Sequence, residues 1–99
     1  PQMTLKTTRF YPDAYLDGPE AYAAFLEDAF ESGDAGVIAD ALGVIGRAKG
    51  MTQLAEETGL SRATLYKAFR DDGNPSLSTL LKVASALGLG LGMKVREHA

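Results

Sequence analysis

The chain of 99 residues contains no cysteine and no tryptophan, and its one histidine, His98, lies next to the C-terminus. The absence of cysteine excludes disulfides, thiolate chemistry and Cys-ligated zinc, and it fits a reducing cytoplasm. With a single histidine as well, the sequence offers no constellation for nucleophilic or metal-assisted catalysis. No apolar run approaches the length of a membrane span. We therefore expect a cytoplasmic, single-domain protein that is not an enzyme, uses no metal or cofactor and contacts no membrane.

Charge is distributed unevenly along the chain, whose net charge is −3. Residues 1–43 carry two cations against eight acids, a net charge of −6, whereas residues 44–70 carry five cations against two acids, a net charge of +3. Contacts with DNA phosphates require local positive charge, and the charge of the whole chain mainly affects non-specific affinity. The middle of the chain therefore has the charge that nucleic-acid binding needs, and the acidic first part needs a separate explanation.

Residues 51–69, MTQLAEETGLSRATLYKAF, have the pattern of a complete helix-turn-helix. A short helix over residues 52–58 carries Leu54 toward the core. Gly59 follows at the position where a left-handed residue is needed, and Ser61 is a typical N-cap for a second helix. The segment therefore predicts two short helices joined by a tight turn.

The two faces of this second helix differ in character. Its apolar face has Leu65, Ala68 and Phe69, and its polar face has Arg62, Ala63, Thr64 and Lys67. A helix of this kind can lay its polar face in the DNA major groove, with its N-terminal residues at the base edges. Sequence-specific DNA binding is therefore our first hypothesis, and the alternative is that these charges are only solvated surface groups.

Three further helices are expected around the helix-turn-helix. The first opens at residues 17–20, DGPE, with Pro in its first turn, and carries an apolar stripe of Tyr22, Phe25, Leu26, Ala29 and Phe30. The second is capped by Asp34, and its inward residues are Val37, Ile38, Ala41, Leu42 and Ile45. The last is capped by Ser76, with a predicted buried face of Leu77, Leu80, Leu81, Ala84 and Leu87. The fold class is therefore all-α, with five helices.

Both ends of the chain suggest short strands. Residues 4–10, TLKTTRF, are rich in threonine, and residues 89–95 alternate apolar side chains with glycine and lysine. A lone strand cannot satisfy its backbone groups, so the second segment should pair with residues 4–10, with a second chain or with a partner protein. We divide the chain into an N-terminal arm or strand (1–16), a helix-turn-helix domain (17–88) and a C-terminal strand and tail (89–99).

Three stretches together resemble one known family. They are residues 15–30 (YLDGPEAYAAFLEDAF), 47–69 (RAKGMTQLAEETGLSRATLYKAF) and 73–91 (GNPSLSTLLKVASALGLGL). The combination is similar to the addiction-module antidote proteins, antitoxins of the host-inhibition-of-growth type with an Xre-type, λ-repressor-like helix-turn-helix. The resemblance implies a homodimer that represses its own operon by binding double-stranded operator DNA. It also implies a cognate small toxin, commonly of the RelE/ParE type.

The resemblance also implies roles for individual residues. The positions that match the groove-reading residues of the family are Ser61, Arg62, Ala63, Thr64 and Lys67, and those that match the backbone-contacting helix start are Thr52 and Gln53. The family commonly has two further residues between this Thr-Gln pair and the Leu-Ala pair. Here Thr52-Gln53 runs directly into Leu54-Ala55, so the role of Gln53 is open.

The acidic first helix has two interpretations. Its carboxylates, including Glu27, Asp28 and Glu31, are either the solvated face of an amphipathic helix or a surface complementary to a basic, RNA-cleaving toxin. Two rival functions also remain. One is a transcriptional regulator without a toxin partner, and the other is a protein-interaction module that does not bind DNA. A short neighbouring reading frame would favour the antitoxin over the first, and salt-dependent DNA binding would exclude the second.

Overall fold

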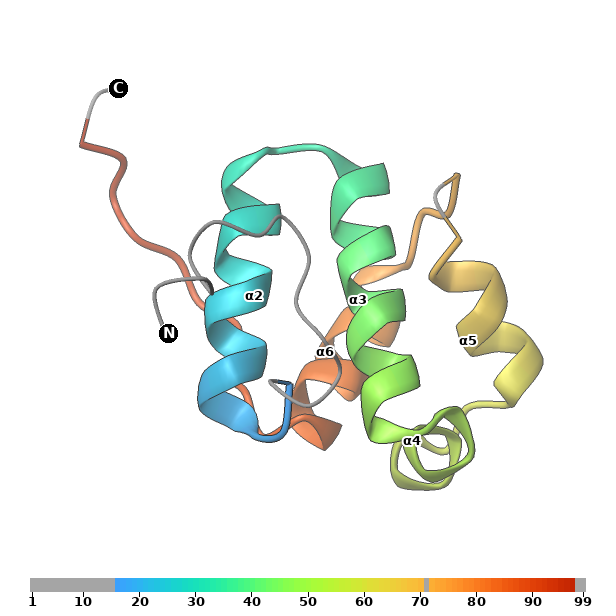
Figure 1. Cartoon of the computed structure of the whole chain (residues 1–99). Helices are drawn as coiled ribbons and strands as arrows, with labels where there is room; N and C mark the ends of the chain where they lie inside the picture. Colours follow the sequence, from blue (N-terminus) through green and yellow to red (C-terminus); the bar gives the residue numbers. More distant parts are fainter. Residues whose placement is uncertain (1–15, 71, 98–99) are drawn as a thin grey trace, which may run out of the picture.

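The computed structural model describes residues 16–70 and 72–97 of the chain (Figure 1). In these ranges it consists of five α-helices and no strands: α2 (Pro19–Glu31), α3 (Ala35–Lys49), α4 (Met51–Thr58), α5 (Arg62–Ala68) and α6 (Leu77–Ala86). The predicted all-α fold with five helices is confirmed. No helix within the described ranges is both long and apolar enough to cross a membrane.

Local side-chain chemistry sets where the helices begin. Helix α2 starts after Gly18, with Pro19 in its first position, where a missing N–H costs no hydrogen bond. The Asp34 carboxylate accepts hydrogen bonds from the backbone N–H groups of Gly36 and Val37, at 2.8 and 3.2 Å. The Asp34 cap satisfies donors that the first turn of α3 leaves unpaired, and the predicted starts of α2 and α3 are confirmed.

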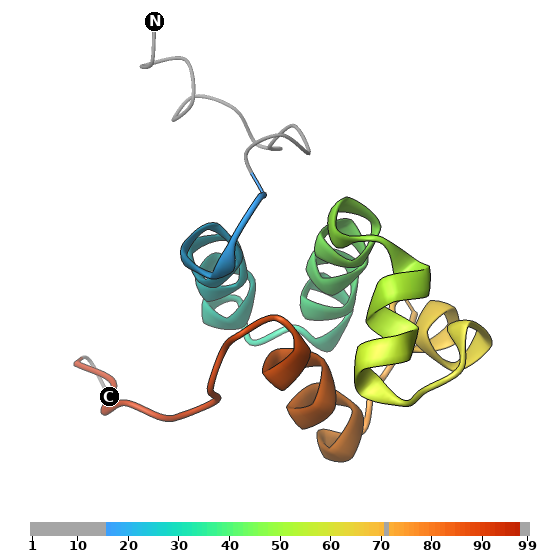
Figure 2. The same cartoon turned by 90° about the horizontal axis from the view of Figure 1, so that it is seen from below.

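The core is one cluster to which all five helices contribute, and α2 joins it through Tyr22, Leu26 and Ala29 and packs on α3 (Figure 2). Helices α3, α4, α5 and α6 each supply one large side chain that is less than 2% exposed: Ile45, Leu54, Leu65 and Val83. Burial of such a side chain stabilises a fold by about 1.5–3 kcal/mol. The helix-turn-helix is therefore part of the core, and the positions of α4 and α5 are fixed by packing.

The predicted buried faces of three helices need correction. In α6, Leu77 and Leu81 are 67% and 49% exposed. Val83, which was not among the predicted buried residues, is 1% exposed. The helix is apolar on most of its circumference, and its packing on α4 selects the side that carries Leu80, Val83 and Leu87. Similarly, the predicted inward residues Phe30 of α2 and Val37 of α3 lie partly exposed near helix ends.

The predicted strand at residues 89–95 is wrong, because these residues have no regular secondary structure. The alternation of apolar side chains favoured a strand, but a strand also needs a neighbour to complete its hydrogen-bond ladder. Gly90 and Gly92 add no side chain that would pack on a sheet. The other predicted strand, residues 4–10, lies outside the described residues.

Candidate nucleic-acid interface

The turn between α4 and α5 is held by one glycine and two hydroxyl groups. Gly59 ends α4 in the left-handed conformation, with φ of 78°, and its N–H donates to the Ala55 carbonyl at 2.9 Å. The Thr58 hydroxyl donates to the Leu54 carbonyl at 2.8 Å and accepts from the Leu60 N–H at 3.2 Å. Ser61 then caps α5 by accepting from the Thr64 N–H at 3.0 Å. The predicted helix-turn-helix geometry is therefore present, with α4 beginning one residue earlier than expected.

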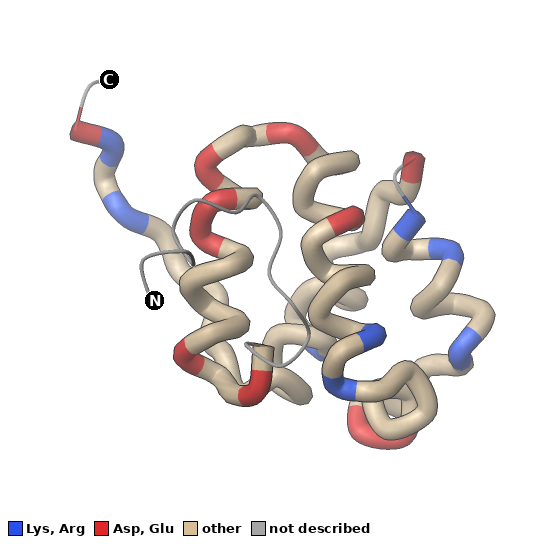
Figure 3. Tube along the Cα trace, in the orientation of Figure 1, with Lys and Arg blue, Asp and Glu red and all other residues tan. Residues whose placement is uncertain are grey.

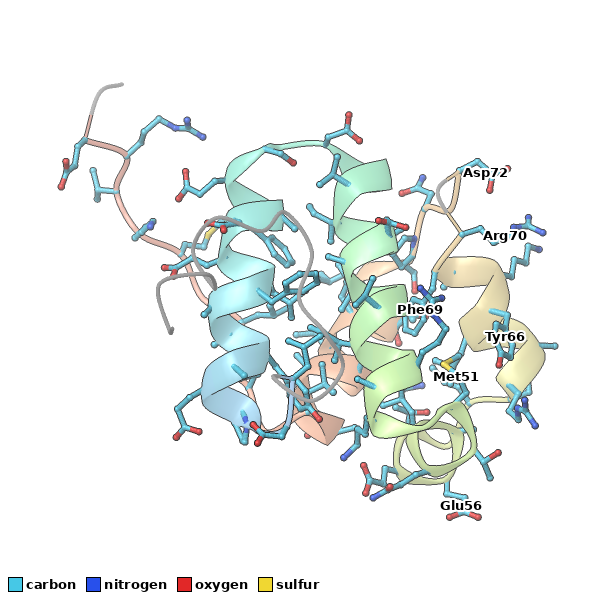
Figure 4. All side chains as sticks on the ribbon, in the orientation of Figure 1. Met51, Glu56, Tyr66, Phe69, Arg70 and Asp72 are labelled. Atoms are coloured by element: carbon cyan, nitrogen blue, oxygen red, sulfur yellow. The ribbon has the colours of Figure 1, made fainter. Side chains whose placement is uncertain are left out.

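Helix α5 is anchored through one face. Leu65 is fully buried, and Phe69 at the end of the helix is 6% exposed. Phe69 and Met51 both point into the space beside α3 (Figure 4). A Cβ at Gly46 would stand 2.9 Å from the Met51 sulfur and 3.3 Å from the Phe69 ring. The glycine therefore allows α3 to approach both side chains closely.

The opposite face of α5 is open to solvent. All of the predicted groove-reading residues are exposed: Ser61, Arg62, Ala63, Thr64 and Lys67. Thr52 and Gln53 are exposed as well, in the first turn of α4. The structure thus brings the predicted set onto the surface of two consecutive helices, which is the arrangement that insertion of α5 into a groove requires.

Within this face, Arg62 is paired with Tyr66. The guanidinium carbon of Arg62 lies 5.7 Å from the centroid of the Tyr66 ring, and Nη2 donates a long hydrogen bond of 3.4 Å to the tyrosine hydroxyl. The two residues are one helical turn apart, so their side chains meet on the helix surface. Tyr66 thereby limits the directions that the Arg62 side chain can take.

A second polar cluster joins the end of α3 to α4. The Glu57 carboxylate accepts from the Gln53 amide at 3.1 Å and pairs with the Lys49 ammonium at 3.2 Å. The hydrogen bond from Gln53, together with the charge and hydrogen bond of Lys49, holds the pKa of Glu57 below its usual value. The Lys49 side chain is 17% exposed, so its ammonium group is held against the Glu57 carboxylate of α4 and is partly shielded from solvent.

The charges of the fold are segregated. In Figure 3 the cations near the end of α3 and along α5 lie at one end of the molecule, and α2 and the α2–α3 connection carry only acids. The separation is partial, because Lys94 and Arg96 follow near α2, and Glu56 and Glu57 lie on α4. A polyanion is therefore attracted to the surface of α5 more than to that of α2.

The predicted partner-binding carboxylates Glu27, Asp28 and Glu31 are all exposed on α2. Two of them have a cation nearby: Lys94 Nζ lies 3.2 Å from Glu31 and 3.9 Å from Glu27. Sequence reasoning missed this contact, and it also missed the Lys49–Glu57 pair. Both join residues from different elements. The Arg62–Tyr66 pair has the i, i+4 spacing, so this contact could have been predicted from the sequence alone.

Sequence comparisons with known proteins show which family the chain is similar to. A family model described as probable addiction module antidote protein matches residues 6–95. An uncharacterized protein of Haemophilus influenzae is 37% identical over 87 residues, which cover 88% of this chain and 90% of that protein. The immunity repressor protein of Bacillus phage phi105 is 53% identical over 46 residues, which cover 46% of this chain and 32% of the repressor. No solved structure matches the chain.

The family match covers nearly the whole described fold, and it agrees with the resemblance that the three sequence stretches indicated. The similarity to the phage repressor is shorter and covers less than half of the chain. With its all-α fold and its helix-turn-helix, the chain belongs to the family of probable addiction module antidote proteins.

Proposed function

We propose that the protein is a DNA-binding antitoxin of a type II toxin–antitoxin module, which neutralises a small toxin and represses its own operon as a dimer. The observation that carries the proposal is the exposed polar face of α5 on a core-anchored helix-turn-helix, in a chain of the antidote family. The similarity to a phage immunity repressor supports the DNA-binding part. The protein then acts by binding and not by catalysis, in the cytoplasm.

In this proposal α5 enters the major groove. Arg62, in the first turn and directed by Tyr66, contacts a guanine edge, while Lys67 contacts phosphate. Ser61 and Thr64 add hydroxyl contacts at the start of the helix, and the exposed methyl group of Ala63 lets the helix approach the bases. Two copies of α5, about 34 Å apart, contact the half-sites of a palindrome.

Helix α4 contributes backbone contacts. Thr52 and Gln53 lie exposed in its first turn, where a helix N-terminus favours phosphate. The side-chain nitrogen of Gln53 donates to Glu57, so the side-chain carbonyl oxygen of Gln53 is the group that remains available for a further contact. We therefore assign Gln53 a positioning role beside Lys49, and Thr52 the phosphate contact.

The toxin is expected on the other end of the molecule. Glu27, Asp28 and Glu31 are exposed on α2, which lies at the other end of the molecule from α5 (Figure 3). A toxin of the RelE/ParE type that binds RNA must carry positive charge, which these carboxylates complement. Contact there would leave the DNA-binding face free.

The test is a gel-shift titration with DNA from upstream of the protein's own gene, at two salt concentrations, against scrambled competitor. We expect specific binding that weakens steeply with salt, since phosphate contacts release counterions. Binding without preference over the competitor would contradict the proposal and favour a protein-interaction module.

A second candidate function is a transcriptional regulator without a toxin, which the phage repressor similarity favours. Co-expression with the product of the neighbouring short reading frame separates the two. Rescue of growth from that product by this protein indicates an antitoxin. A harmless neighbour, together with specific DNA binding, indicates the plain regulator.

A further inference from the structure

A cation from outside the helix-turn-helix lies at the C-terminal end of α5. A Cβ at Gly43 of α3 would stand 3.3 Å from the Phe69 carbonyl oxygen and 3.4 Å from Nη1 of Arg47. Phe69 is the residue at which α5 ends. The guanidinium of Arg47 and the last backbone group of α5 therefore border the same small space, which stays open because Gly43 has no side chain.

Arg47 differs from the neighbouring cations in having no partner among the described residues. It is exposed, and within the part of the chain that the structure describes it takes part in no hydrogen bond or ion pair. Lys49 instead pairs with Glu57 at 3.2 Å. Arg70 pairs with Asp72 at 3.4 Å. The charge of Arg47 is therefore the one at this end of α5 that is open to an anion from outside the chain.

The length of α5 brings this end close to DNA phosphates when the helix enters the major groove. Its seven residues, Arg62–Ala68, are about 10 Å long, and the groove is about 12 Å wide. With the first turn of α5 at the base edges, the last residue of the helix therefore stands near one of the two phosphate strands that border the groove. Arg47 lies beside that last residue.

We propose that Arg47 of α3 binds a backbone phosphate of DNA beside the end of α5, so that the DNA interface extends beyond the helix-turn-helix. This inference rests on the DNA-binding part of the proposed function and adds a residue from a third helix to it. Phosphate contacts fix the orientation of a protein on the duplex and carry no sequence information. A contact from α3 therefore holds the core, and not only α5, against the DNA.

The alternative role of Arg47 is structural. A cation beside the C-terminal end of a helix interacts favourably with the helix dipole, and α5 ends beside this guanidinium. In that case removal of the charge lowers the stability of the fold, while the salt dependence of DNA binding by the folded protein stays unchanged. Salt dependence separates the two roles, because it counts the phosphates that the protein neutralises.

The test measures the affinity of the full chain for two duplexes by fluorescence anisotropy at several salt concentrations. One duplex comes from upstream of the protein's own gene, and the other is its scrambled counterpart. Arg47→Gln should reduce the slope of log Kobs against log salt by about 0.9, and weaken binding to both duplexes about eightfold at about 0.1 M salt. Arg47→Lys keeps the charge and should keep the wild-type slope.

Arg96→Gln is the matched control, because it makes the same change at an exposed arginine near α2. It should leave the slope unchanged. A slope for Arg47→Gln equal to that of the wild type would overturn the proposal and leave the structural role. An equal decrease for Arg96→Gln would also overturn it, because any surface cation would then act alike.

Failure of the proposed function gives a different result. A wild type that binds both duplexes equally contradicts operator recognition, and the slopes on scrambled DNA still decide the role of Arg47. A wild type that binds neither duplex overturns both.

A second measurement does not depend on the folding of any variant. The Nε–Hε signal of Arg47 in isotope-labelled wild type is followed by two-dimensional NMR while the scrambled duplex is added. We expect this signal to shift and that of Arg96 to stay in place. A stationary Arg47 signal at saturating DNA would overturn the proposal.

Discussion

The guanidinium of Arg62 packs against the ring of Tyr66, with its carbon 5.7 Å from the ring centroid and Nη2 at 3.4 Å from the hydroxyl. Both side chains are on the exposed face of α5. A long side chain on a surface helix normally samples many rotamers, and fixing it on binding costs free energy. The contact with Tyr66 restricts this freedom before DNA arrives.

The first prediction concerns base recognition by this arginine. Arg62→Ala should cost roughly 1–3 kcal/mol on the operator and relax the preference at one base pair. Lys67→Ala should weaken operator and random DNA by similar factors, because phosphate contacts carry no sequence information. Fluorescence anisotropy with the operator and its single-base variants measures both. Equal losses for Arg62→Ala on operator and random DNA would count against base recognition at that position.

The second prediction concerns the pH dependence of the Lys49–Glu57 contact. The pKa of Glu57 is lowered from 4.5 by Gln53 and Lys49, so the charged carboxylate favours the folded state. Its contribution is fully present above about pH 4.5 and is lost as the pH falls through the lower, folded-state pKa. In urea denaturation, Glu57→Gln should be less stable than the wild type at pH 7, and the difference should shrink at pH 3. A difference that stays constant with pH would show that the charge of Glu57 contributes nothing.

The third prediction concerns the turn between α4 and α5. Gly59 has φ of 78° with nothing near its Cβ position, so a side chain there meets backbone strain without a clash. Gly59→Ala should cost about 1 kcal/mol of unfolding free energy, and Gly59→Asn less, because asparagine tolerates the left-handed region. Gly90→Ala, also with open space but without the positive φ, is the matched control. Urea titrations in which Gly59→Ala equals Gly90→Ala would refute this account of the turn.

The fourth prediction concerns toxin binding by the acidic face of α2. Asp28 is exposed on α2, whereas Glu27 and Glu31 have Lys94 close to them. Asp28→Lys should therefore weaken binding of the toxin while leaving operator binding and sedimentation unchanged. Asp40→Lys on α3 makes the same charge change elsewhere and should leave toxin affinity intact. If isothermal titration calorimetry gives Asp28→Lys the wild-type affinity, the acidic face is only a solvated surface.

Local chemistry made much of the fold predictable. Asp34, Ser61 and Ser76 each cap a helix by accepting backbone hydrogen bonds within three residues. Gly59 likewise ends α4 through its own conformation. Such interactions depend on residues that are neighbours in the sequence, so the helix limits and the exposed face of α5 follow from the sequence alone.

Features that depend on tertiary packing were not predictable in the same way. Helix α6 is apolar enough for several faces to serve as the buried one, and contact with α4 decides that Val83 is inside and Leu77 outside. The segment after α6 alternates like a strand, yet no neighbouring strand among the described residues completes a ladder. Likewise, Lys94 approaches Glu31 across 63 positions of sequence, and no periodicity reveals such a pair.

The central claim is that the face of α5 binds operator DNA, and chemical-shift mapping tests it most directly. Isotope-labelled protein is titrated with the operator duplex, and backbone amide signals are followed by two-dimensional NMR. We predict the largest shifts for Ser61 through Lys67 and for Thr52 and Gln53, with small changes along α2. Large shifts centred on α2 or on residues 89–97, or none on α5 at saturating DNA, would contradict the account.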